Sequence, residues 1–170
     1  SCSGGDAALF ADLASANGLE FPPLNSSAIT LLRNTLGDKV PLNNPLDYHT
    51  YIWGDVPKLR DCFAGMMLAD IDVCTLILDF PKENGVPIEG WDEIICAYIS
   101  AHSQHKKPSI VVSTLAELMP PNVAQQLLEN GIAPMQGLAD TASAIAIAAR
   151  IGLAQQQCDR TQCLAINLTP

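Results

Sequence analysis

The chain has 170 residues, which is close to the usual size of one domain. Apolar residues make up 48% of it but aromatic residues only 5%, so its core must be built from Ala, Leu, Ile and Val, as in helix-covered parallel sheets. Eighteen acidic residues against nine basic ones give a net charge of −9, which repels phosphate backbones and excludes nucleic acid as an expected partner. No apolar run approaches the ~20 residues of a membrane span and no signal-peptide pattern opens the sequence, so we expect a cytoplasmic protein without membrane contacts.

The six cysteines show no spacing that suits zinc, such as Cys-x-x-Cys or a Cys/His cluster. Cys62, Cys74 and Cys96 lie inside apolar periodic segments, where a free thiol behaves as a small hydrophobic side chain. A chain of this length needs neither disulfides nor a metal to fold. We therefore predict buried or inert thiols and no metal site.

Helical periodicity, β-branched runs, capping residues and Gly or Pro stops predict the elements. In chain order they are a helix over 6–17, a short strand over 19–21, a helix from 25 or 26 to 36, a long loop over 43–54, a helix over 56–68, a strand over 73–80, a helix over 90–105, a strand over 109–114, a helix over 121–129, a strand over 132–135 and a helix over 138–151. The last helix has small residues nearly all round, so we expect it to pack tightly.

This alternation predicts right-handed βαβ crossovers and a flavodoxin-like three-layer α/β sandwich with a mainly parallel sheet. Residues 1–153 form the predicted domain, and the Gln-containing segment 154–170 is interpreted as a linker. A doubly wound sheet should open with a strand, whereas this chain opens with a helix. We expect that the chain is cut just inside its first strand, of which only Ser1 and Cys2 would be the end, or that another segment, such as 163–168, takes its place.

Two glycines at the start of the first predicted helix indicate an anion site. Gly4 and Gly5 let a ligand approach the backbone, and the first N–H groups of the helix are unpaired at its positive end. We predict that Ser3, Gly4, Gly5, Asp6 and Ala7 bind a phosphate. The alternative is a tight strand–helix turn with Ser3 or Asp6 as the cap. No Gly-Lys-Ser/Thr follows, so the segment is not a P-loop.

The loop 43–47 is the second candidate segment. Pro45 holds Asn44 extended, and loops after strands line the ligand crevice of a doubly wound sheet. We predict Asn44 and Asp47 as crevice residues. The alternative is a loop locked by hydrogen bonds from these side chains to nearby backbone.

No set of residues forms a recognisable catalytic group, so no catalytic residue is predicted. His102 and His105 lie at the end of a predicted helix, and their favourable interaction with the negative carboxyl terminus of that helix explains their presence there. His49 lies in the loop near the expected crevice. Cys2, beside the helix start, is expected to have a lowered pKa but has no assigned base. Ser3 is not part of a Gly-x-Ser-x-Gly nucleophile motif.

Several segments taken together resemble a known family, the succinyl-CoA-ligase-like flavodoxin domain of NDP-forming acyl-CoA synthetases. These enzymes are relatives of succinyl-CoA synthetase and ATP-citrate lyase. The resemblance covers about residues 1–153. Each motif alone is weak evidence for the family, whereas their order and spacing together are fairly specific. The segments are 3–14 (SGGDAALFADLA), 18–24 (GLEFPPL), 44–47 (NPLD), 90–92 (GWD), 112–115 (VSTL) and 131–134 (GIAP).

The resemblance implies a multidomain ligase that makes acyl-CoA from a carboxylic acid, CoA and ATP, through an acyl phosphate and a phosphohistidine. It implies that the helix starting at 3–8 points its amino end at that phosphohistidine. The family's phosphorylated histidine lies in a Gly-His-Gly-type loop, and His49, His102 and His105 have no such neighbours.

The CoA-binding and ATP-grasp domains of the family are absent from these 170 residues, so the resemblance implies an isolated domain that is inactive and binds no cofactor alone. CoA, ATP and Mg would belong to the parent enzyme, and the partners would be its other domains, with a homo-oligomer possible. One alternative is a stand-alone small-anion or nucleotide-binding regulatory module without catalysis. Another is an independent flavodoxin-like hydrolase or redox protein, against which stand the missing triad and the few aromatic residues available to stack a flavin.

Overall fold

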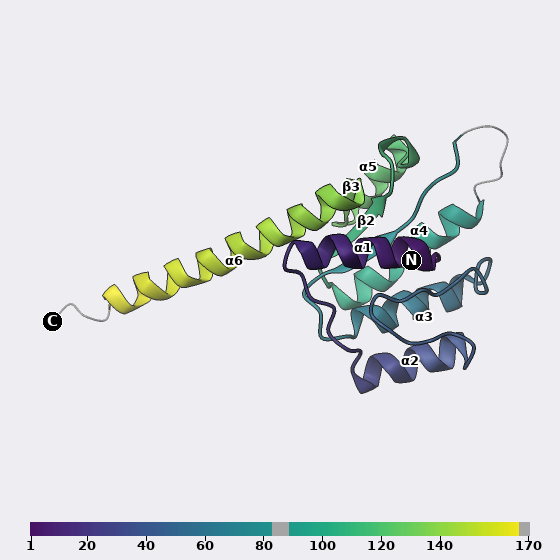
Figure 1. The fold of residues 1–170 in the computed structure, drawn as a ribbon, viewed down its shortest axis with the longest axis horizontal. Coiled ribbons are helices and arrows are strands. Elements are labelled where there is room, and N and C mark those ends of the chain that lie inside the picture. Colours follow the sequence, from purple (N-terminus) through teal and green to yellow (C-terminus); the bar gives the residue numbers. More distant parts are fainter. Residues whose placement is uncertain (83–88, 167–170) are drawn as a thin grey trace.

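The computed structural model describes the backbone of residues 1–82 and 89–166, and the side chains within 1–82 and 90–157. Its centre is a parallel sheet of three strands in the order β1 (Cys74–Ile77), β2 (Ser109–Ser113) and β3 (Ala133–Gln136). In the register of the sheet, Cys74 lies opposite Ser109, and Ile110 lies opposite Ala133. Helices cover the sheet on both sides (Figure 1).

Except for the end of the last one, the helices begin and end close to the predicted positions. They are α1 (Gly4–Ala16), α2 (Ser26–Leu36), α3 (Val56–Met67), α4 (Glu89–His105), α5 (Pro121–Glu129) and α6 (Leu138–Ile166), with a short 3-10 turn, η1 (Ala116–Leu118), before α5. Ser3, Asn25 and Asp55 cap α1, α2 and α3, because each side chain accepts a hydrogen bond from the third N–H group after it. These bonds explain why the first three helices start where they do.

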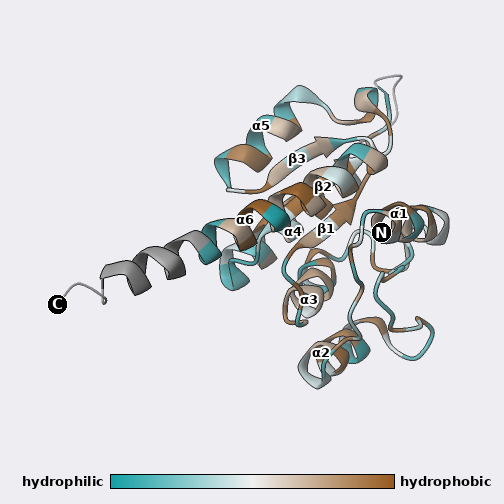
Figure 2. Ribbon diagram, turned by 60° about the vertical axis from the view of Figure 1, so that its left-hand side comes forward, coloured by the Kyte–Doolittle hydropathy of each residue, from teal (hydrophilic) through white to brown (hydrophobic). Residues whose placement is uncertain are grey.

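Alternate strand residues pack against different helices, which produces the three layers. Leu76 of β1 and Val111 of β2 lie in one core with α2, α3 and α4. Ile77 and Val112 lie in a second core with Phe10 of α1 and the start of α6. Hydrophobic residues are concentrated on β1, β2 and the start of α6 (Figure 2). The predicted α/β fold, a flavodoxin-like three-layer sandwich, is confirmed.

Two predictions of local structure are wrong. Residues 19–21 are not a strand: they form no ladder with any described segment, although Leu19 and Phe21 pack against the second core. The last helix does not end at 151 but continues to Ile166, so 154–166 are helical and the segment 163–166 does not form a strand. The division into a domain and a linker at 153 stays a prediction.

The expected tight packing of the last helix holds only for its first turns. Ala142 and Ala146 are buried, whereas Ile147 and Ile151 are exposed. Beyond its contacts with α1 and the sheet, α6 runs outward from the body of the domain (Figure 1). Small residues all round a helix therefore did not require neighbours on every side.

Candidate functional site

The amino end of α1 is partly capped by the protein itself. The Ser3 hydroxyl oxygen accepts a hydrogen bond from the N–H group of Asp6 at 3.4 Å, and the Ser3 carbonyl accepts one from Ala7 at 3.1 Å. Within the described part of the chain, the N–H groups of Gly4 and Gly5 have no such partner, and both glycines are exposed. Two of the predicted amides are thus open, while those of Asp6 and Ala7 are not available to a ligand.

The two predicted segments meet at this helix end. A hollow of about 400 Å³ separates α1 from the loop that follows α2. A Cβ atom on Gly4 would lie only 3.0 Å from the Oδ2 atom of Asp47, so glycine allows this close approach of the loop. The residues lining the hollow are Gly4, Ala7, Ala8 and Ala11 of α1, and Pro41, Asn43, Pro45, Asp47 and His49 of the loop.

The loop is held by its own side chains, as the alternative interpretation predicted. The Oδ1 atom of Asp47 accepts a hydrogen bond from the backbone N–H of His49 at 2.9 Å, an Asx turn. His49 has a φ of 56°, and its Nδ1 atom lies 3.6 Å from Asp47 Oδ2. The hollow therefore has one carboxylate and one imidazole on its loop side.

Asn44 lies away from this hollow. Its side-chain amide donates a hydrogen bond to the carbonyl of Pro22 at 3.1 Å, and it lines a different cavity on the other side of Pro45. Asn44 and Asp47, the two predicted crevice residues, thus line different cavities, and their role in binding a ligand stays a prediction. Only Asp47 reaches the amino end of α1.

The cysteines differ from the sequence-based expectation in two places. Burial raises the pKa of the Cys2 thiol, and the nearby amino terminus offsets this only in part, so the expected lowering is wrong. Cys96 is exposed, whereas Cys62 and Cys74 are buried as predicted. Burial raises the pKa of Cys62 to about 12. The described residues contain no group of three or more His, Cys, Asp or Glu side chains placed to hold a metal ion.

Sequence reasoning missed a polar pair at the carboxyl ends of β1 and β2, the edge where open α/β sheets bind ligands. The carboxylate of Asp79 accepts hydrogen bonds from the backbone N–H and the hydroxyl of Thr114, both at 2.6 Å. Trp91 donates its ring N–H to the Asp79 carbonyl at 2.7 Å. Asp79 lies inside the predicted strand 73–80, where it was read as a strand residue. An acidic residue near the end of an otherwise apolar run is the sequence signal that could have indicated this polar pair. Its contacts tie the two strand ends together.

Neither a protein-family model nor a curated protein matches this sequence. A solved structure does. The chain is similar to the crystal structure of PH0766 from Pyrococcus horikoshii OT3, with a TM-score of 0.68 and 22% sequence identity. The match covers 85% of this chain and 33% of PH0766, so the chain spans about a third of that protein's length. At this identity the likeness to PH0766 shows a shared fold. None of the described helices is long and apolar enough to cross a membrane.

Proposed function

We propose that residues 1–153 are the flavodoxin-like domain of an NDP-forming acyl-CoA synthetase and that α1 stabilises the phosphoryl group of the phosphohistidine formed in that enzyme. The observation that carries the proposal is the pair of exposed amides at Gly4 and Gly5, which have no hydrogen-bond partner among the described residues; Gly4 also lines the hollow next to α1. The order and spacing of the sequence segments that resemble this family support the assignment, and the flavodoxin-like three-layer fold is the one that this assignment requires.

The chemistry proposed for this domain is electrostatic. The phosphoryl group carries negative charge on its oxygens. The two N–H groups and the positive end of the helix dipole stabilise that charge without a covalent bond to the group. Because these donors belong to the backbone of α1, their direction is set before the phosphate arrives. CoA, ATP and Mg²⁺ are assigned to the CoA-binding and ATP-grasp domains of the proposed parent enzyme, a cytoplasmic ligase.

Asp47 opposes a bound anion, since its carboxylate approaches Gly4 closely. A charge interaction of about 1 kcal/mol, typical of contact distance in water, corresponds to about fivefold in affinity. We expect Asp47→Asn, which keeps the shape and the acceptor for the His49 N–H group, to bind phosphate about fivefold more tightly than the natural chain. A phosphate titration of both chains at pH 8 measures this, and equal or weaker binding by Asp47→Asn contradicts a site beside Gly4.

The proposed site itself is tested by titrating inorganic phosphate into the ¹⁵N-labelled chain at constant ionic strength. The amide signals of Gly4 and Gly5 should shift and saturate, and sulfate should shift the same signals while chloride should not. Shifts spread evenly over the surface, with none between Gly4 and Ala7, would count against the proposal.

A stand-alone anion-binding module would use the same amides, so phosphate binding alone does not select the synthetase. Sequencing the complete reading frame around this segment discriminates between them. A CoA-binding domain before it and an ATP-grasp domain after it are expected for the synthetase. A regulatory module predicts neither.

A further inference from the structure

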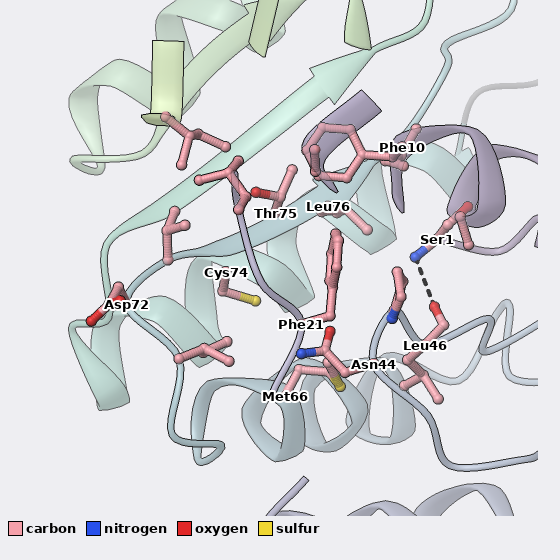
Figure 3. Close-up of a pocket in the computed structure, with 18 of the residues that line it drawn as sticks. Ser1, Phe10, Phe21, Asn44, Leu46, Met66, Asp72, Cys74, Thr75 and Leu76 are labelled. Atoms are coloured by element: carbon pink, nitrogen blue, oxygen red, sulfur yellow. Dashed lines mark hydrogen bonds between the residues drawn. The ribbon is translucent and has the colours of Figure 1, made fainter. Parts of the chain in front are cut away.

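We draw no further inference here: the strongest candidate, the cavity of about 550 Å³ between β1 and residues 18–22 (Figure 3), carries nothing new, because a strand seated in it restates the established topology of the flavodoxin-like fold.

Discussion

The packing of α2 against α3 depends on Gly65, and replacing it with alanine tests this part of the fold. A Cβ atom at Gly65 would lie 2.7 Å from Cγ and 2.8 Å from Cδ2 of Leu32, a buried side chain of α2. Overpacking of this kind costs about 1–3 kcal/mol, and the better helix propensity of alanine returns up to about 1 kcal/mol. We expect Gly65→Ala to lower the free energy of unfolding by up to about 2 kcal/mol.

Urea unfolding with an unchanged m-value measures this effect. Gly90→Ala in α4 is the matched control, because its new Cβ would meet the Trp53 ring at an ordinary 3.7 Å. It should leave stability unchanged or raise it by up to about 1 kcal/mol. In a double-mutant cycle, Leu32→Ala should cost about 1–3 kcal/mol less in the Gly65→Ala background than in the natural chain. Equal stability of the two glycine variants, or additive effects in the cycle, would refute the close contact.

Two further predictions concern the thiols and the amino terminus. Cys96 is exposed, whereas Cys62 is buried and burial raises its pKa to about 12. Alkylation at pH 8, followed by peptide mass spectrometry, should therefore modify Cys96 at least tenfold faster than Cys62. Equal rates at the two thiols would contradict the burial of Cys62. Burial lowers the pKa of the Ser1 amino group from 8.0. Between that lowered pKa and about pH 8, the unfolded chain therefore binds more protons than the folded chain. The free energy of unfolding should accordingly rise with pH across this range. Acetylation of Ser1 should flatten this rise in urea unfolding at pH 6 and pH 8, and an identical rise in both chains would be the contrary result.

Local signals predicted most of the helices. The caps Asn25 and Asp55 determine the starts of α2 and α3, and Gly37, with a φ of 71°, ends α2 as expected. These signals act within one turn of helix, so the sequence contains them in full. The strands β1 and β2 were predicted for a related reason, since apolar runs rich in β-branched residues leave few other structures.

Predictions that depended on distant neighbours failed. Whether 19–21 becomes a strand depends on a partner along its edge, which its own residues do not encode. The number of exposed residues on α6 depends on how far the rest of the domain extends along it. That Asn44 and Asp47, three residues apart, line different cavities also depends on the surrounding chain, and the local sequence does not show it. For the candidate site, sequence reasoning found the glycines and Asp47 but not how much of the helix end Ser3 already caps.

The most direct test of the proposed phosphate site compares Gly4→Pro with Gly4→Ala. Both add a Cβ atom next to Asp47, but only proline removes the Gly4 N–H group. Proline is tolerated at the first position of a helix, and Ser3, with φ −131° and ψ 122°, already has the extended conformation required before it. A hydrogen bond to a charged group contributes about 1.5–3 kcal/mol, so Gly4→Pro should bind phosphate at least tenfold more weakly than Gly4→Ala in an NMR titration. Equal affinities of the two variants would contradict a phosphate held by the amino end of α1.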